Sequence, residues 1–320
     1  MYVRFVAALV ALAAGAAGVV VVVLLLRAVP GPTSTSSAPS APAAPSRPAI
    51  AGGRIATPDD PHFPSPSPGA VVLSTEAGNR ALALAVMPGL VRVSVLSPVG
   101  PGVSGLNVLL RFGRGRQVAA NPCGPGCYQS TVEGTPDSPV SVTLNGKAYR
   151  FELPKLPARD ASAIVARAAS TWNALHTLVW HERLASDPTT VLVSVYRAVA
   201  PDELEYTIAG ASGAVIIGGT RWDRSAPRAP WHMSIQAPPV RQPQPFWQEA
   251  FDARLVGTGR VHGRPVWNVT FFDPATPSWF KAVIDQKTYR TLVLDMTAAS
   301  HFMHDVYGPF NTSIRLHAPK

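Results

Sequence analysis

The chain has 320 residues, a formal net charge of +9, 47% hydrophobic residues and only 15% charged residues. The basic residues are scattered along the chain and form no strongly basic tail, so we expect no nucleic-acid partner. The hydrophobic fraction is ordinary for globular domains, and the length predicts about one to three of them.

An uninterrupted apolar run covers residues 5–26 and carries no charge. As a helix it would be roughly 33 Å long, enough to cross the hydrocarbon core of a bilayer. A cleaved signal peptide is the alternative, but its apolar region is usually about 7–15 residues long and precedes a small-residue cleavage site. This run instead ends in three leucines and Arg27. We therefore expect residues 1–27 to be a single-pass signal-anchor in the cell membrane, with the C-terminal body extracytoplasmic.

Residues 28–68 are rich in Pro, Ala and Ser and contain almost no large apolar side chains. Such a segment cannot bury a core, and its composition is typical of a disordered, partly polyproline spacer. We expect it to hold the folded domains at a distance from the membrane.

Apolar and small or polar residues alternate between residues 69 and 154, most clearly over 82–86, 91–95 and 106–112. A period of two is typical of half-buried strands. The dipeptide Asn145-Gly146 lies between two such strands and suits a type I′ hairpin turn, in which both residues need positive φ. These short strands predict an immunoglobulin-like β-sandwich over residues 69–154.

Cys123 and Cys127 are the only cysteines, and both follow the predicted anchor. Disulfides persist outside the cytoplasm, and the short Gly-Pro-Gly spacer can bring the two sulfurs together. A thiolate site for copper or zinc is an alternative, although two thiolates rarely complete a structural metal site. Free thiols are a third alternative, and we predict the disulfide.

The sandwich segment contains the stretch AVMPGLVRVSVLSPVGPGVSGLNVLLRF, followed by CGPGCY. It resembles the periplasmic sandwich of the FixH/YtkA-like group and the domain appended to CopD-type copper-resistance membrane proteins. The chain departs from the CopC-type copper pattern, because the N-terminal His and the Met-rich loop are absent. Only Met87 lies in this unit, so the resemblance does not imply a copper site here.

Residues 155–320 begin with one amphipathic helical pattern and continue as a series of strands. Apolar residues recur at helical spacing from Ile164 to Leu175, with Asp160 as the expected N-cap. This order predicts a curved antiparallel half-barrel wrapped over a helix, with a concave apolar face where a ligand can bind. The candidate ligand-binding side chains on that face are Trp222, Trp231, Phe246, Trp247, Trp267, Trp279 and Phe280.

The stretches ASAIVARAASTWNALHTLVWHERL and VHGRPVWNVTFFDPATPSWFKAVIDQKTYRTLVLDM resemble the LolA/LolB/RseB-type lipoprotein-carrier fold. The resemblance implies binding of a lipid, of another apolar ligand or of a protein partner in the cell envelope. We therefore predict a mainly β protein that acts as a membrane-anchored binding or sensor protein. The anchor at residues 5–26 would be its contact with the membrane.

Catalytic signatures such as a G-x-S-x-G elbow or a phosphate-binding loop are missing from the sequence, so we expect neither an enzyme nor a cofactor. If the chain were an enzyme, His181, Glu182 and Asp223 would be the first residues to mutate. An accessory role in copper handling or resistance is the alternative function. The stretch HFMHDVYGPFN is similar to the C-terminal region of CopD-type proteins. The alternative rests on this resemblance, on Cys123 and Cys127, and on the soft ligands His301 and Met303, which share one face of a predicted strand.

Overall fold

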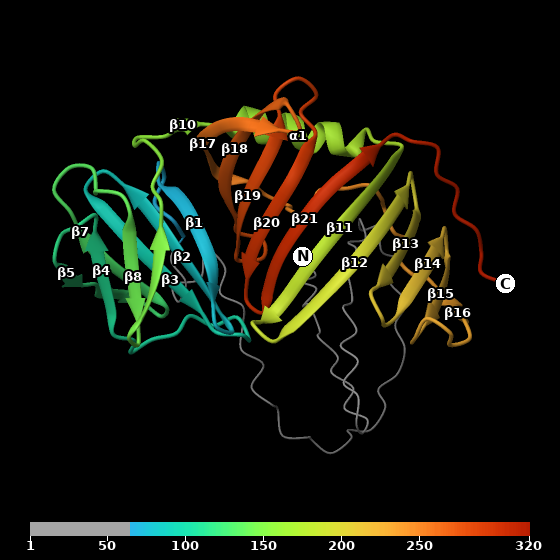
Figure 1. Cartoon of the computed structure of the whole chain (residues 1–320), viewed down its shortest axis with the longest axis horizontal. Helices are drawn as coiled ribbons and strands as arrows, with labels where there is room; N and C mark the ends of the chain where they lie inside the picture. The colour runs from blue at the N-terminus through green and yellow to red at the C-terminus, as the bar shows by residue number, and fades with distance from the viewer. Residues whose placement is uncertain (1–64) are drawn as a thin grey trace, which may run out of the picture.

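The computed structural model describes residues 65–320, so the predicted anchor at 1–27 and nearly all of the 28–68 spacer lie outside the described residues. In the described part, three antiparallel sheets and one α-helix make up the fold (Figure 1), which confirms the mainly β prediction. No helix within residues 65–320 is long and apolar enough to span a bilayer.

Two of the sheets face each other around one apolar core, in which Leu82, Leu84 and Leu110 are fully buried. The five-stranded sheet has the order β1 (Val71–Ala77), β2 (Arg80–Met87), β3 (Leu90–Leu96), β7 (Cys127–Thr131), β6 (Asn121–Gly124). The four-stranded sheet has the order β5 (Gln117–Ala119), β4 (Val108–Phe112), β8 (Val140–Leu144), β9 (Lys147–Phe151). We call this unit the sandwich.

The hairpin between β8 and β9 turns at the predicted dipeptide. Asn145 and Gly146 have φ values of 48° and 84°, the left-handed conformation that a type I′ turn needs. The resulting register places Val142 opposite Tyr149. One face of the hairpin therefore contributes to the sandwich core.

The predicted disulfide joins Cys123 to Cys127 across the turn between β6 and β7, with the two Cα atoms 5.0 Å apart. Gly126 in this turn has a φ of 69° and packs against Gly102, which lies in the loop after β3. A Cβ atom at position 126 would lie 2.4 Å from the Gly102 Cα and 2.6 Å from the Val95 carbonyl oxygen. Two glycines and the disulfide therefore fix the close approach of this turn to the rest of the sandwich.

Replacing Gly126 with Ala should destabilise the sandwich far more than replacing Gly134. Both glycines have positive φ, but a Cβ at Gly134 would meet no atom within 4 Å. Gly134→Ala should therefore cost only the backbone term of about 1 kcal/mol. Gly126→Ala should cost about 2 kcal/mol more, because backbone atoms must move apart. Thermal unfolding of the two variants measures the difference, and equal losses would contradict the steric account.

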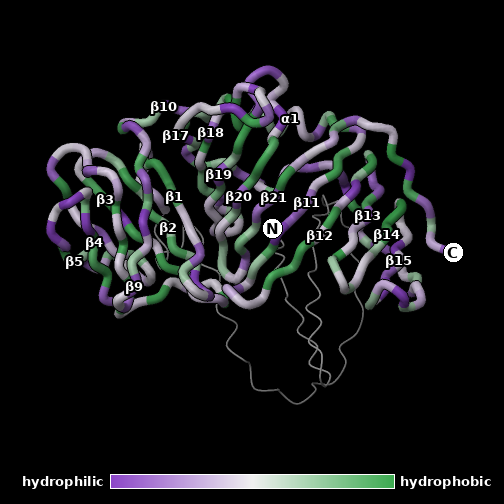
Figure 2. Tube along the Cα trace, in the orientation of Figure 1, coloured by the Kyte–Doolittle hydropathy of each residue, from purple (hydrophilic) through white to green (hydrophobic). Residues whose placement is uncertain are grey.

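The third sheet has twelve antiparallel strands and curves around helix α1 (Ser162–Asn173), and we call this unit the half-barrel (Figure 1). Its strand order is β10 (Arg159–Asp160), β17 (Phe251–Val261), β18 (Arg264–Asp273), β19 (Ser278–Asp285), β20 (Thr291–Ala298), β21 (His301–Phe310), β11 (Thr177–Asp187), β12 (Thr190–Val199), β13 (Glu203–Ile208), β14 (Gly213–Ile217), β15 (Thr220–Arg224), β16 (His232–Ile235). Figure 2 shows hydrophobic residues concentrated along its strands.

Helix α1 packs Val165, Ala168 and Trp172 against one face of the twelve-stranded sheet, which we call the inner face. The predicted N-cap is wrong, because Asp160 belongs to β10 and pairs with Arg254 on β17. Ala161 stands at the N-cap instead and makes no side-chain capping bond. The backbone pairing of β10 thus sets where the helix begins.

The opposite, outer face of the half-barrel carries the sandwich. A separate apolar cluster joins the two units, with Val72, Ala81, Ala83 and Leu96 from the sandwich and Ala185, Phe272, Trp279 and Phe302 from the half-barrel. Two hydrogen bonds flank it, from Gly69 N to Asp252 Oδ2 at 2.7 Å and from Ser300 Oγ to the Pro98 carbonyl at 2.9 Å. The two units therefore share a partly apolar interface.

Candidate functional site

The inner face of the half-barrel is filled by the chain itself. Besides α1, the segment 236–250 crosses this face and places Val240 and Trp247 in the core. The Trp247 ring lies 5.7 Å from the Trp172 ring and 5.3 Å from the Phe271 ring, centroid to centroid. A crevice between α1 and β20 is too narrow for a water molecule. A ligand on the inner face would have to displace one of these segments.

Four aromatic residues on the inner face form a row of direct neighbours across adjacent strands, and we call such a row a rung. Tyr307, Trp180, Tyr196 and Tyr206 are direct cross-strand partners, in that order, on β21, β11, β12 and β13. The Trp180 and Tyr196 rings stack at 4.5 Å with an interplanar angle of 2°. Such pairs stabilise a core beyond the burial of their area. This rung belongs to the packed core and leaves the inner face closed.

Two carboxyl groups lie beside the aromatic rung. Glu182 and Asp305 are direct cross-strand partners and are 6% and 0% exposed. The Tyr196 hydroxyl donates to Glu182 Oε1 at 3.1 Å, and the Tyr307 hydroxyl donates to Asp305 Oδ2. Burial raises the pKa of Glu182 to about 7. Burial, together with the Glu182 charge, raises the pKa of Asp305 to about 8, so the pair holds protons near neutral pH.

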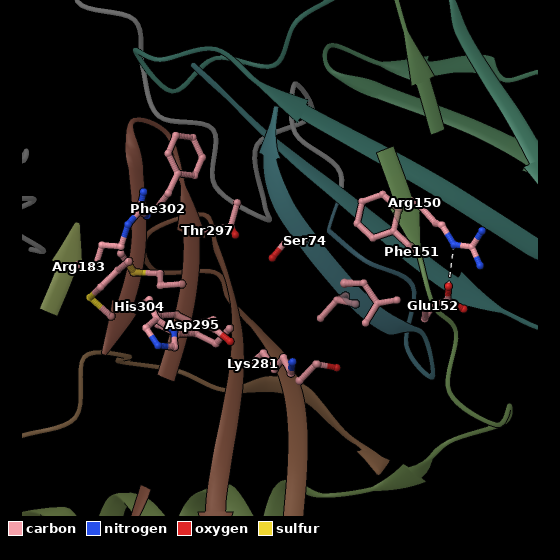
Figure 3. Close-up of a pocket in the computed structure, with 16 residues that line it drawn as sticks. Ser74, Arg150, Phe151, Glu152, Arg183, Lys281, Asp295, Thr297, Phe302 and His304 are labelled. Atoms are coloured by element: carbon pink, nitrogen blue, oxygen red, sulfur yellow. Dashed lines mark hydrogen bonds and ion pairs between the residues drawn. The ribbon is translucent and has the colours of Figure 1, made fainter. Parts of the chain in front are cut away.

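A cleft of about 380 Å³ opens on the outer face, where the sandwich meets the half-barrel (Figure 3). Ser74 on β1 and Phe151 on β9 border it from the sandwich, while Arg183 and His304 border it from half-barrel strands. Its size lies within the range of roughly 300–1,000 Å³ that is usual for small-molecule sites. This cleft is therefore the candidate functional site.

Strand register explains the chemistry of the half-barrel wall of the cleft. One rung on the outer face is charged and runs Lys281, Asp295, His304, Arg183 across β19, β20, β21 and β11. The neighbouring rung on that face is mostly apolar and runs Trp279, Thr297, Phe302, Ala185 across the same strands. Of this second rung only Thr297 and Phe302 border the cleft, because Trp279 and Ala185 are buried against the sandwich. Residues on one rung stand side by side, so the cleft has a charged edge next to a small floor of Thr297 and Phe302.

The two acidic residues of the cleft already have partners. Asp295 pairs with His304 at 2.6 Å, and Glu152 pairs with Arg150 at 2.7 Å. Within residues 65–320, Arg183 and Lys281 form no ion pair with an acidic residue. They stand at opposite ends of the charged rung, three strand spacings or about 14 Å apart. The cleft therefore presents two cations that are free to meet an anionic group.

The aromatic residues predicted to line the concave face do not form one surface. Trp247 and Phe280 are buried in the inner core, with Phe246 packed against it. Trp267 lies at the margin of that core, 5.2 Å from the Tyr289 ring.

The other three predicted ligand residues lie away from the inner core. Trp279 is on the outer face, buried between the half-barrel and the sandwich, so it does not line the concave face. Trp222 is also on the outer face, where it pairs with Met233, and Trp231 lies beneath Arg224 just before β16. Trp279 and Phe280 point to opposite faces of the sheet because successive residues of a strand alternate between its two faces.

The residues considered for metal binding or catalysis are also dispersed. Met303 is buried in the inner core, and both cysteines are in the disulfide. His301 is the first residue of β21, and burial lowers its pKa. No group of three or more His, Cys, Asp or Glu residues that could hold a metal occurs within residues 65–320.

The three residues named for a hypothetical enzyme are separated as well. His181 is exposed on the outer face, whereas its neighbour Glu182 is buried on the inner face. Asp223 lies on β15, where it is held by the Arg221 guanidinium at 2.7 Å. Asp305 was not among the predicted residues. It stands at strand spacing between Met303 and Tyr307, and an acid on the same face as two apolar residues is a signal of a buried polar group.

No protein-family model matches the sequence, and no curated protein matches it. Among solved structures, the chain is similar to LprF from Mycobacterium bovis, with 8% identity, a TM-score of 0.37 and coverage of 52% of this chain and 99% of that one. It is similar to the lipoprotein LppX from Mycobacterium tuberculosis, with 10% identity, a TM-score of 0.36 and coverage of 48% and 97%. It is also similar to a LolA superfamily protein from Nitrosomonas europaea, with 8% identity, a TM-score of 0.25 and coverage of 50% and 96%.

Proposed function

We propose that this chain is a membrane-anchored, extracytoplasmic binding or sensor protein that takes an amphipathic anion, such as a lipid with an anionic head group. The main supporting observation is the cleft of about 380 Å³ between sandwich and half-barrel, which is bordered by Phe302 and Phe151 and by two cations, Arg183 and Lys281, that form no ion pair among the described residues. The apolar part of the ligand would lie over Phe302 and Phe151, and its anionic group would meet Arg183 or Lys281.

The physical reason for this ligand class is the pairing of two surfaces within one cleft. Apolar surface removed from water stabilises a complex by roughly 25 cal/mol per Å². A carboxylate or phosphate that leaves water needs charged donors, and an arginine guanidinium can bind either group through two parallel hydrogen bonds. A neutral apolar ligand would leave the charged rung without a function, so an anionic amphiphile fits better.

The location is proposed from the apolar run at residues 5–26 and is supported by the disulfide Cys123–Cys127, since disulfides persist in oxidising compartments. A protein partner in the envelope would distinguish the chain with ligand in the cleft from the chain without it. A ligand on the inner face, as the sequence suggested, would require α1 or the segment 236–250 to move. An accessory role in copper handling has no supporting contact within residues 65–320 and stays a prediction.

The cations of the cleft can be tested with a short-chain anionic amphiphile that carries a photoreactive group. In the full chain, the Arg183→Gln/Lys281→Gln double variant should bind it about tenfold or more weakly, because the charged donors are lost. The two single variants identify which cation meets the anionic group. Arg114→Gln/Arg116→Gln is the matched control, because it removes the same charge from an exposed turn of the sandwich. Equal affinity of the cleft variant and the control would rule out the cleft cations.

A further inference from the structure

The far edge of the half-barrel has a surface that the proposed cleft does not explain. It consists of β16 and the turn that joins it to β15, residues 224–235. We propose that this edge surface rests on an anionic lipid bilayer, with the side chains of β16 in contact with the lipid. This proposal is independent of the ligand in the cleft.

The first support is charge. Residues 224–235 include Arg224 and Arg228 and contain no Asp or Glu. The nearest acid before the segment is Asp223, which lies on the inner face and is paired with Arg221. A cluster of basic residues without acids is attracted to anionic lipid head groups, and the attraction weakens as salt is added.

The second support is exposed apolar surface at the same place. Met233 and Ile235 are 72% and 85% exposed, and both point to the outer face of the sheet. On that face Trp222 pairs directly with Met233, which widens the apolar strip from β16 to β15. Single exposed apolar residues are ordinary, but a contiguous strip beside basic residues is typical of a surface that inserts shallowly into a membrane.

Trp231 connects the apolar strip to the basic residues. It directly precedes β16, and the Arg224 guanidinium lies over its ring at 4.7 Å. Tryptophan is enriched at the level of lipid head groups because its ring is apolar and its N–H is polar. Arginine can extend its charged end to the head groups while its stem covers apolar surface. The pair therefore suits the boundary between lipid tails and head groups.

A partner strand added to β16 fits this edge less well. The strand has only four residues, and Pro230 before it and Pro238 and Pro239 after it limit how far a partner could pair. Short edge strands next to prolines are a common way in which proteins prevent strand addition. The basic charge also has no role in main-chain pairing. A bilayer accounts for the charge, the tryptophan and the exposed strip together.

The test uses the full chain in lipid vesicles, with an environment-sensitive fluorophore on a single introduced cysteine. The native cysteines are joined in a disulfide, so Met233→Cys is labelled alone. Val99→Cys in the sandwich, 70% exposed, is the matched control. In vesicles of phosphatidylcholine with phosphatidylglycerol, the label at 233 should shift to the blue, brighten several-fold and be quenched by nitroxide lipids. The label at 99 should remain as it is in water.

Two further conditions separate the alternatives. Arg224→Gln/Arg228→Gln and added salt should each reverse most of the change at position 233. The proposal is overturned if the label at 233 stays as exposed as the label at 99, or responds equally in vesicles of phosphatidylcholine alone. A change that grows with protein concentration and needs no anionic lipid would point to a second copy of the chain and would also overturn it.

Discussion

As the pH rises from about 5 to about 9, the melting temperature of the chain is expected to fall. In a Glu182→Gln/Asp305→Asn double variant it is expected to fall much less. Burial raises the pKa of Glu182 to about 7 and that of Asp305 to about 8. The two carboxyl groups are cross-strand partners in the core. Among the described residues, neither of them forms an ion pair with a basic residue. A negative charge on either one is therefore poorly compensated.

The direction follows from proton binding. In the unfolded chain both carboxyls lose their protons near pH 4, whereas in the folded chain they keep them to about pH 7 and 8. Between these values the folded state binds more protons, so the free energy of unfolding falls as pH rises. The stabilisation is complete below about pH 4 and is lost as pH passes through the two folded pKa values. The expected loss is on the order of 3 kcal/mol or more.

The test is to measure the melting temperatures of the native chain and of the double variant by calorimetry between about pH 5 and about pH 9. A loss of this size lowers the melting temperature by roughly 5–10 °C in a chain of this length. His301 and Asp273 also have shifted pKa values, lowered and raised respectively by burial. The informative quantity is therefore the difference between native chain and double variant. Parallel pH profiles would show that the buried pair does not control the stability.

Trp172→Ala should cost about 3–5 kcal/mol, the usual range for deleting a buried tryptophan side chain. Trp172 is the largest of the three buried side chains of α1, and its ring lies 4.7 Å from the Tyr307 ring and 5.7 Å from the Trp247 ring. Its loss leaves a cavity between the helix, the segment 236–250 and the sheet. The helix should then open locally before the sheet unfolds.

Hydrogen exchange combined with denaturant unfolding measures both effects. Ser170→Ala on the exposed side of α1 is the matched control and should change the stability by less than about 0.5 kcal/mol. If the amides of α1 stayed protected from exchange in Trp172→Ala, the prediction would be contradicted, and contacts of α1 other than those of Trp172 would hold the helix. A gain of apolar-ligand binding in this variant would indicate that the inner face can open into a site.

Local patterns in the sequence were sufficient for several elements. Asn145-Gly146 predicted its turn because few dipeptides tolerate two positive φ values in succession. The alternation over 91–95 predicted which side chains of β3 face the core, and Val91, Val93 and Val95 are indeed buried. The four-residue spacing of Cys123 and Cys127 predicted the disulfide. Each of these features depends on residues that are close in sequence.

The cleft could not be predicted in this way. Its walls combine β1 and β9 of the sandwich with β19, β20, β21 and β11 of the half-barrel, so it depends on strand order and on how two units meet. Periodicity gives the face of each side chain but not the register between distant strands. One error was avoidable, because Trp279 and Phe280 are adjacent on a strand and cannot line the same face.

The most direct measurement is native mass spectrometry of the full chain purified in a mild detergent, with and without Ser74→Trp. Ser74 borders the cleft from β1, and an indole there would fill much of the space (Figure 3). Val306→Trp, exposed on the outer face but outside the cleft, is the matched control. The proposed function predicts a bound amphipathic anion in the native chain and in Val306→Trp, and its loss in Ser74→Trp. A ligand retained in Ser74→Trp, or no bound amphiphile in the native chain, would contradict the cleft as the binding site.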